Sequence, residues 1–470
     1  MAPALPASRP IVIALALALL PGAFTDRLQA NEQAPQPNVV VLPETLEASP
    51  AYLRIQGQLI HDGEAMTGSG TGGMDTLRAL RGVQDLSDLD AMLDQQTATV
   101  DTLSFILDTG ASGHVVSRGT IRAFDIPVEH DAVYHETGLH GETAMGVTAP
   151  LTLGLRGSPR GGDPDQAWHR VGDDVRLLIN KSPTNALTKM VMGEINIVGM
   201  PAIRDFIVEV DPEPLTRAQA LMQDLPSEMG RGGADLADLG HMLDDLEGVG
   251  GGPTVVLHDR LDPGVEFDYV LDLEYRDYSR HENPDDRGPK PDLSPNPVVT
   301  GLRMQLDGHV AEGDWLLDTG APVSMISTET AKALGLYDEQ GEPTRRAAFS
   351  VPLGGVGGGF EQIPGFVLDH LDVETADGTV LRWPRPRVLV KDISTRLDSG
   401  EVITLDGIFG TNLLLPTMGG LGGALGLPDM MATMPFRKFY IDGPRRRLLL
   451  EAVEPEDLAR FKHIQTRQDE

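Results

Sequence analysis

A duplicated segment constrains this chain more than any other feature of its sequence. An apolar run ends in Asp-Thr-Gly-Ala at residues 105–111 (FILDTGA), and a second one does so at residues 315–321 (WLLDTGA). The two aspartates, Asp108 and Asp318, are 210 positions apart (318 − 108). Because the residues around each tetrapeptide also correspond, we interpret the pair as an internal repeat.

More distant segments repeat at matching intervals. Gly199 follows apolar residues 91 positions after Asp108 (199 − 108), and Gly410 does so 92 positions after Asp318 (410 − 318). Segments 51–60 and 300–310 both alternate apolar and polar residues, which is typical of half-buried strands. Glycine-bearing turns at 136–146 and 351–360 separate each Asp from its later Gly. The sequence therefore predicts a mainly β chain made of two homologous lobes.

Only one helix is indicated with any clarity. Segment 327–336 (STETAKALGL) has Ser327 or Thr328 as an N-cap, and Gly335 follows its last apolar turn. Two hairpins are also expected. One has Asp442-Gly443-Pro444 at its turn, within 438–453. The other joins 205–212 to 252–259, and its turn is replaced by an acidic, Gly-rich excursion.

Domain boundaries follow from composition along the chain. Arg9 precedes the ten apolar residues 11–20, which suit a signal-peptide core and are too few to span a bilayer. An uncleaved anchor or a buried helix is the alternative. We predict export to the periplasm or the extracellular space, with 31–45 as a loose tail. The predicted order is: signal peptide 1–30; N-terminal lobe 46–275 with insertions at about 61–98 and 211–252; linker 276–297; C-terminal lobe 298–453; tail 454–470.

Composition excludes several classes of function. The 470 residues carry a formal net charge of −32, which argues against binding to nucleic acid or to an anionic membrane. The chain has no cysteine, so disulfides, thiolate metal sites and cysteine nucleophiles are excluded. Beyond the signal segment, no run of about 18 apolar residues predicts a membrane span. His130, His135 and His140 lack the spacing of a metal site, so no metal and no cofactor is expected.

The duplicated tetrapeptide suits one kind of chemistry. Each apolar strand delivers a carboxylate, Gly110 and Gly320 allow a tight turn, and the threonines between can hold it through their hydroxyls. Two carboxyl groups brought together share one proton, so one acts as base and the other as acid. Such a pair can activate water against a peptide bond. Its apparent pKa values belong to the pair, so the sequence leaves the two roles unassigned.

These motifs resemble the aspartic peptidases, and the Ala after each Asp-Thr-Gly makes the chain more similar to the retropepsin-like members than to pepsin. The resemblance implies two β-barrel lobes related by a pseudo-two-fold axis, with both motifs in one chain, so that a monomer suffices for hydrolysis of a peptide or protein substrate. It also implies flaps that close on the substrate and, after each flap, a motif of two apolar residues and Gly. A non-catalytic module that holds an extended peptide by strand pairing is the alternative. The implied residues are: catalytic Asp108 and Asp318; supporting Thr109, Gly110, Thr319 and Gly320; flap Gly138, His140, Gly141, Gly354, Gly355, Gly357 and Gly358; structural Gly199 and Gly410.

Overall fold

A computed structural model describes eleven stretches of the chain. These are residues 39–44, 52–70, 98–138, 141–158, 167–181, 194–213, 253–278, 290–354, 360–396, 401–416 and 435–454. The predicted signal peptide 1–30, most of both predicted insertions, and the tail from 455 onward lie outside the described residues.

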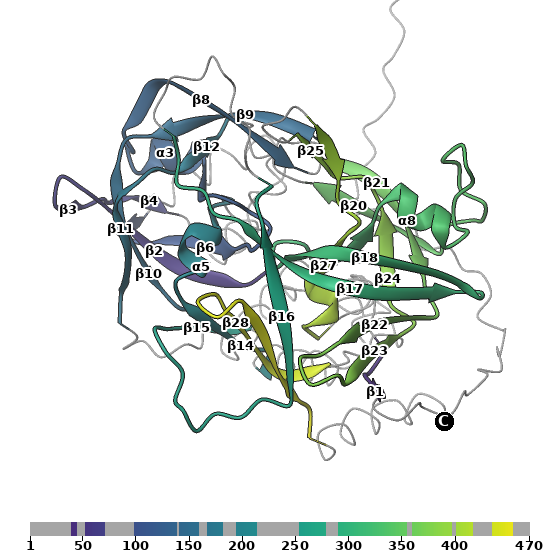
Figure 1. Ribbon diagram of the computed structural model, residues 1–470. Coiled ribbons are helices and arrows are strands. Elements are labelled where there is room, and N and C mark those ends of the chain that lie inside the picture. The colour runs from purple at the N-terminus through teal and green to yellow at the C-terminus, as the bar shows by residue number, and fades with distance from the viewer. Residues whose placement is uncertain are drawn as a thin grey trace, which may run out of the picture. The chain divides into compact units, whose positions relative to one another are not determined.

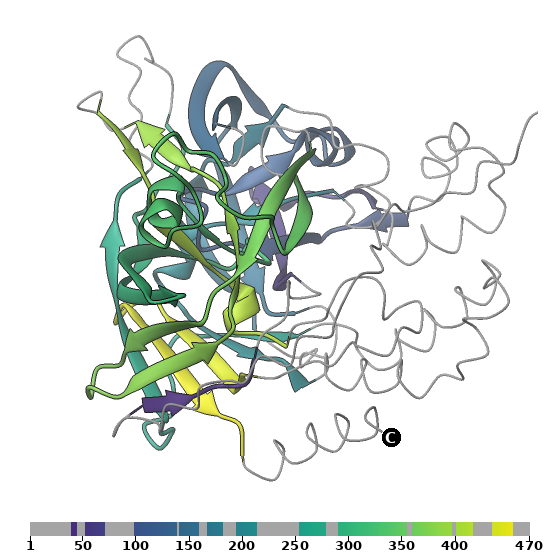
Figure 2. The ribbon, with the colours of Figure 1, turned by 90° about the vertical axis from the view of Figure 1, so that its right-hand side faces the viewer.

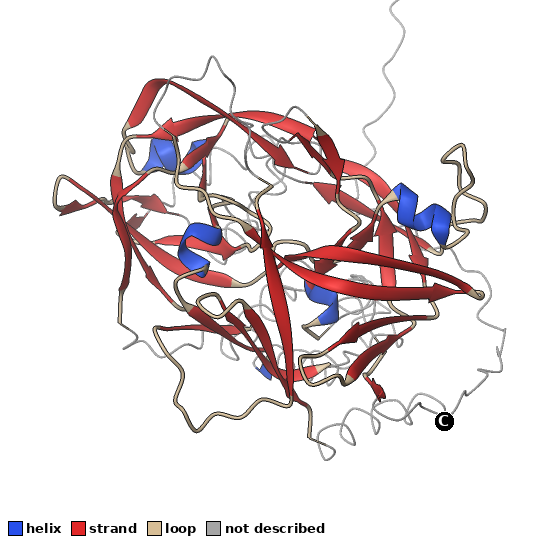
Figure 3. Cartoon of the chain, viewed as in Figure 1, coloured by secondary structure: helices blue, strands red, loops and turns tan. Residues whose placement is uncertain are grey.

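The described residues are mainly β, which confirms the predicted fold class at that level (Figure 3). Helical segments are short. They are α3 (Arg118–Ala123), α5 (Met200–Ile203), α8 (Thr328–Ala333) and the 3-10 turn η3 (Thr411–Leu413). None of the described helices is long and apolar enough to cross a membrane.

One curled sheet is built from the N-terminal region (Figure 1). Its hydrogen-bonded order is β11-β10-β2-β6-β13-β7-β12-β9-β8, and β3 pairs with the C-terminal end of β2. The bounds are β2 (Arg54–His61), β3 (Glu64–Ala65), β6 (Leu103–Leu107), β7 (Val115–Ser117), β8 (Val128–Gly138), β9 (Gly141–Thr148), β10 (Leu151–Arg156), β11 (His169–Val175), β12 (Leu178–Asn180) and β13 (Ile197–Val198).

The second sheet contains strands from both regions of the chain. Its order is β15-β14-β28-β29-β16-β17-β18-β27-β19-β24-β21-β20, and β22, β23 and β1 continue from β17. The bounds are β1 (Val39–Val41), β14 (Ile207–Asp211), β15 (Thr254–His258), β16 (Tyr269–Arg276), β17 (Asn296–Leu306), β18 (His309–Asp318), β19 (Ser324–Ile326), β20 (Phe349–Gly354), β21 (Phe360–Val367), β22 (His370–Glu374), β23 (Val380–Pro384), β24 (Arg387–Val390), β27 (Gly407–Gly410), β28 (Phe436–Asp442) and β29 (Arg447–Ala452). Two two-stranded antiparallel sheets complete the strands: β4 (Gly68–Gly70) with β5 (Ala98–Val100), and β25 (Ser394–Arg396) with β26 (Val402–Thr404).

Both expected hairpins pair antiparallel. Asp442 is opposite Arg447 in the C-terminal hairpin β28–β29, and Asp211 is opposite Thr254 in β14–β15. The two hairpins then join, because β14 pairs with β28 (Figure 2, where the C-terminal hairpin is yellow). The C-terminal hairpin therefore adds its strands to the sheet that begins with β15 and β14.

The expectation of a loose tail at 31–45 is wrong for its last part. Val39–Val41 forms β1, which pairs in parallel with β23, and the next residue, Leu42, is 7% exposed. Three successive valines are strong strand formers, and an apolar strand edge in the C-terminal region is available to them.

The predicted helix at 327–336 is α8, and Ser327 is its cap. The Ser327 hydroxyl accepts the Thr330 N–H at 3.1 Å, and Gly335 ends the helix with a φ of +69°. The corresponding helix of the N-terminal region, α3, was not predicted. Ser117 caps it in the same way, but Asp125 takes the left-handed position with a φ of +48°, so the glycine signal is missing.

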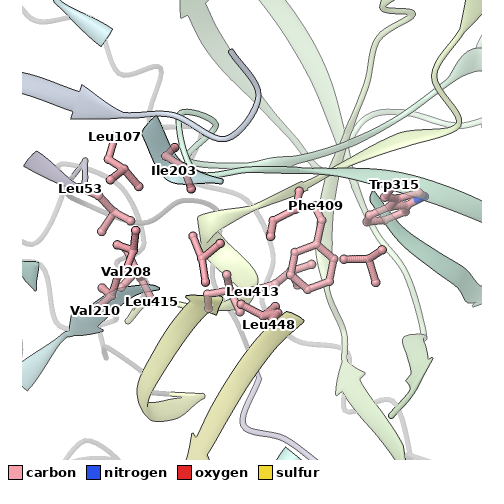
Figure 4. Packing of buried hydrophobic residues seen from close by; sticks show 14 of the residues in the cluster. Leu53, Leu107, Ile203, Val208, Val210, Trp315, Phe409, Leu413, Leu415 and Leu448 are labelled. Carbon is pink, nitrogen blue, oxygen red and sulfur yellow. The ribbon is translucent and has the colours of Figure 1, made fainter. Parts of the chain in front are cut away.

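A single hydrophobic cluster runs through both regions (Figure 4). Leu53 and Leu107 from the N-terminal region belong to it together with Phe409 and Leu448 from the C-terminal region. Complete burial of such a side chain contributes about 1.5–3 kcal/mol relative to its exposure. This shared core holds the ends of β6 and β18 in fixed positions.

Candidate functional site

The two Asp-Thr-Gly-Ala segments lie at the ends of central strands. We call residues 108–111 the first turn and residues 318–321 the second turn. β6 lies between β2 and β13, and the Asp108 N–H donates to the Val198 carbonyl at 3.0 Å. β18 lies between β17 and β27, with Asp318 opposite Gly410. Each carboxylate therefore emerges from a buried strand that is hydrogen-bonded on both sides.

Each aspartate accepts the same two backbone hydrogen bonds. Asp108 Oδ1 accepts the N–H groups of Gly110 at 2.8 Å and Ala111 at 3.2 Å. Asp318 Oδ1 accepts those of Gly320 at 2.8 Å and Ala321 at 3.1 Å. These donors fix the position of each carboxyl group and favour its charged form.

The two threonines connect the turns reciprocally. The Thr109 hydroxyl donates to the Leu317 carbonyl at 2.6 Å, and the Thr319 hydroxyl donates to the Leu107 carbonyl at 2.7 Å. Each hydroxyl also accepts the other threonine's backbone N–H, at 3.0 and 3.1 Å. Both threonines are at most 1% exposed, so four buried hydrogen bonds join residues about 210 positions apart.

The glycines bring the carboxyl groups together. A Cβ added to Gly110 would lie 2.5 Å from Cγ of Asp318, and one added to Gly320 would lie 2.5 Å from Cγ of Asp108. Each carboxyl group therefore packs directly on the opposite turn, where only a glycine leaves room. The predicted pair of aspartates is brought together, and both residues remain half-buried rather than sealed from solvent.

Burial raises the pKa of both carboxyl groups. For Asp108, hydrogen bonds with Asp318 and with the backbone of Gly110 and Ala111 oppose the effect of burial on the pKa. For Asp318, the nearby charge of Asp108 raises the pKa further. Two adjacent carboxylates cannot both ionise cheaply, so the pair retains one proton at pH values above the usual titration range of aspartate. The arrangement can accept one proton and donate another.

Tyr52 was not predicted, yet it lies close to this pair. Burial raises the pKa of its phenol, and the charges of Asp318 and Asp108 raise it further, while Arg54 lowers it. The Leu53 carbonyl next to it accepts the Leu107 N–H at 2.8 Å. Tyr52 lies two residues before β2, and no sequence signal marked it.

Gly199 and Gly410 occupy the positions predicted for structural glycines. A Cβ on Gly199 would lie 2.2 Å from the Gly113 carbonyl oxygen, and one on Gly410 would lie 2.7 Å from the Val323 carbonyl carbon. Both backbones pass directly beneath the turns that follow the aspartates. A side chain at either position would displace the neighbouring turn.

Different side chains accept the hydrogen bonds from the N–H groups of Gly199 and Gly410. Gly199 N donates to Nδ1 of His114 at 3.2 Å, whereas Gly410 N donates to the Ser324 hydroxyl at 3.1 Å. His114 is fully buried, and its Nε2 has no protein partner among the described residues. Burial, with a smaller effect of the Arg204 charge, lowers the pKa of His114 to about 4.

The predicted linker contributes to the site. Leu293 and Ser294 lie against the residues that follow the first turn. The Ser294 N–H donates to the Ser112 carbonyl at 2.9 Å, and Leu293 forms an isolated antiparallel β-bridge with Gly113. Asn296 opens β17 and donates from Nδ2 to the carbonyls of Thr109 at 3.0 Å and Gly110 at 3.1 Å. The polar, Pro-rich composition of 276–297 indicated a linker and masked this role.

The two predicted flaps correspond to hairpins. β8 and β9 pair up to Gly138 opposite Gly141, and β20 and β21 pair up to Gly354 opposite Phe360. His140, Gly355, Gly357 and Gly358 lie outside the described residues, so the prediction for the flap tips stays a prediction. Tyr134 of β8 is 6% exposed and packs with Val115, Met145, Val147, Leu178 and Ile197. Among the described residues, no group of three or more His, Asp or Glu side chains could hold a metal ion.

Comparisons with known proteins do not identify a family. No family model and no curated protein matches the chain. Among solved structures it is similar to conglutin gamma, a basic 7S globulin from lupine seeds, at 9% identity and a TM-score of 0.31, covering 87% of this chain and 97% of that one. It is also similar to basic 7S globulin from soybean, at 11% identity and a TM-score of 0.28, covering 87% of this chain and 99% of that one.

Proposed function

We propose that this chain is an aspartic endopeptidase of the retropepsin-like type, with two homologous lobes related by a pseudo-two-fold axis. One observation carries the proposal: each carboxyl group, Asp108 and Asp318, packs on the glycine of the opposite turn, and the two threonines exchange hydrogen bonds across the junction. A purely structural strand exit needs neither the reciprocal contacts nor a pair of adjacent carboxyl groups.

The proposed reaction uses both members of the pair. The oxygen of a water molecule bonds to the carbonyl carbon of the peptide, its proton passes to the ionised carboxylate, and the protonated carboxyl group gives its proton to the carbonyl oxygen. The C–N bond then breaks as the newly protonated carboxyl group donates to the leaving nitrogen and the other carboxylate takes a proton from a hydroxyl of the tetrahedral intermediate, which restores the starting pair. No covalent intermediate and no metal takes part, and one chain supplies both groups.

The edges of the two flap hairpins support a peptide as the substrate. Within the described residues, β8 and β20 are the last strands on their sheet paths. The backbone groups along such an edge can pair with an extended peptide, which is one recurring way for proteins to bind one. The same observation favours the alternative function, a module that binds peptides without cleaving them.

Export of the chain remains a proposal that rests on the apolar run at 11–20. The net charge of −32 supports a peptide or protein as the partner rather than nucleic acid.

The test replaces each aspartate by asparagine and follows cleavage of a peptide library from acidic to neutral pH. Asp108→Asn and Asp318→Asn are each expected to lower kcat/KM by about 10²–10⁴-fold, because each removes one proton-transfer group. Asp62→Asn is the matched control, since the Asp62 side chain is 91% exposed. Wild-type turnover in either dyad variant would contradict the proposal. Peptide binding without turnover in the wild type would favour the binding module.

A further inference from the structure

Asn296 connects the predicted linker to the first turn. It is 1% exposed, and Nδ2 donates to the carbonyl oxygens of Thr109 and Gly110. Its Oδ1 accepts the Ser112 hydroxyl at 2.8 Å. Because carbonyl oxygens only accept, the amide nitrogen has to face them, and the orientation of the side chain follows from its partners.

The two carbonyls belong to the peptide groups that hold the Asp108 carboxylate. The Thr109 carbonyl shares its peptide group with the Gly110 N–H, and the Gly110 carbonyl shares its own with the Ala111 N–H. Those two N–H groups are the donors to Asp108 Oδ1. A hydrogen bond to a peptide carbonyl polarises that peptide and makes its N–H a stronger donor. Asn296 therefore strengthens both hydrogen bonds to the Asp108 carboxylate.

The second turn lacks this support. Among the described residues, no side chain donates to the carbonyl of Thr319 or of Gly320. Strand register shows what stands in its place: Arg54 is opposite Ile106 in β2–β6, and Val298 is opposite Leu316 in β17–β18. Two residues earlier lie Tyr52 and Asn296, respectively. The position that holds an amide in one strand therefore holds a phenol in the other.

We propose that Asn296 is a positioning residue that makes the two carboxyl groups unequal: Asp108 is the ionised member that activates water, and Asp318 carries the shared proton. The assignment of roles in catalysis rests on the proposed function. The unequal ionisation itself does not, because it concerns only hydrogen bonds within the protein.

Other titratable groups near the dyad do not account for this inequality. Asp318 is the charged side chain that acts on Asp108, beside the backbone donors of the two turns. Tyr52 faces both carboxyl groups, and they raise its pKa, so it stays neutral while they titrate. His114 lies behind the first turn and is uncharged above about pH 4, because burial lowers its pKa.

The decisive experiment first replaces one aspartate of the pair, so that the other titrates without coupling, and then removes the Asn296 side-chain amide. Asp318→Asn leaves Asp108 to titrate alone, and Asp108→Asn leaves Asp318 alone. The pKa of the remaining carboxyl group is measured by NMR of protein labelled with ¹³C at the aspartate carboxyl carbon, with and without Asn296→Ala. We expect Asn296→Ala to raise the pKa of Asp108 by about half a unit and to leave that of Asp318 within about 0.2 unit.

One further variant and one further measurement separate a positioning role of Asn296 from a general loss of structure. Asn296→Ser keeps one donor and is expected to give a smaller upward shift for Asp108; it also replaces Asn296→Ala if that variant does not fold. In the chain with both aspartates, the acid limb of the pH profile of kcat/KM is expected to move to higher pH, with the alkaline limb unchanged. Equal shifts for both carboxyl groups, or no shift for Asp108, would overturn the proposal. These titrations give their answer even if the chain cleaves no peptide.

Discussion

The first and second turns make the same contacts with each other but are held from behind by different residues. Each carboxylate accepts hydrogen bonds from two backbone N–H groups, and each threonine hydroxyl donates to the opposite strand. The opposite carboxyl group packs on the glycine of each turn. Behind the first turn lies His114, where the second has Ser324. The threonine and glycine contacts between the turns are thus matched, whereas the residues behind the turns differ.

The difference in support is largest beneath the structural glycines. In the C-terminal region, Asn412 Oδ1 accepts both the N–H and the hydroxyl of Ser324, at 2.9 and 2.8 Å. In the N-terminal region the residue that corresponds to Asn412 is Pro201, which has no side-chain acceptor and lies in α5. In the N-terminal region the buried imidazole of His114 accepts the glycine N–H, whereas in the C-terminal region the Ser324 hydroxyl, itself hydrogen-bonded to Asn412, does so. The two turns therefore share the geometry of the contacts around the carboxyl groups but differ in the residues that support each turn from behind.

The strongest way to break this comparison is to fill the space between the turns. Gly110→Ala and Gly320→Ala each place a methyl group about where the opposite carboxyl group lies. We expect each to lower kcat/KM for the proposed peptide hydrolysis by about 10²-fold or more, because a displacement of about 1 Å at reacting groups has that effect. Gly154→Ala is the control, since its new methyl group meets the nearest atom, in Trp168, at 3.6 Å. Strongly unequal losses would show that the turns are not equivalent.

Removing a threonine hydroxyl tests the reciprocity of the hydrogen bonds. Thr109→Val leaves the Leu317 carbonyl and the Thr319 N–H buried without partners, and Thr319→Val does the same to the Leu107 carbonyl and the Thr109 N–H. Each unpaired buried group costs about 1–3 kcal/mol. Urea unfolding should show similar losses for the two variants, and a much smaller loss for the matching Thr→Ser changes. A large loss for only one valine variant would contradict the symmetry of this junction.

The pH dependence of stability sharpens the difference in support between the two turns. His114 has a pKa of about 4 in the folded chain against 6.5 ordinarily, so its contribution to stability is complete above pH 6.5 and is lost as the pH falls through 4. The loss is on the order of 3 kcal/mol, and it has no counterpart at Ser324. We expect His114→Ser to flatten the decline of the unfolding free energy between pH 6.5 and 4. His61→Ser, at a histidine that is 37% exposed, is the control substitution. An unaltered decline in His114→Ser would show that another group causes the acid sensitivity.

Local features of this chain were readable from its sequence because local residues decide them. Alternating apolar residues predict the strands, Ser327 and Gly335 mark the ends of α8, and Asp442-Gly443-Pro444 marks a hairpin turn. The same reasoning missed α3, where Asp125 adopts a backbone conformation that glycine usually signals. Repetition of Asp-Thr-Gly-Ala also singled out the two aspartates before any contact was known.

Only the tertiary structure decided what those elements do to one another. The threonine hydrogen bonds join residues 208–212 positions apart, and Asn296 reaches the first turn across 186 and 187 positions. Nothing in the local pattern around Asn296 indicates a partner at that distance, and a polar, Pro-rich neighbourhood indicates a linker. The pairing of β14 with β28 is equally remote. Contacts of this kind arise from how the strands pack, and a single sequence does not display them.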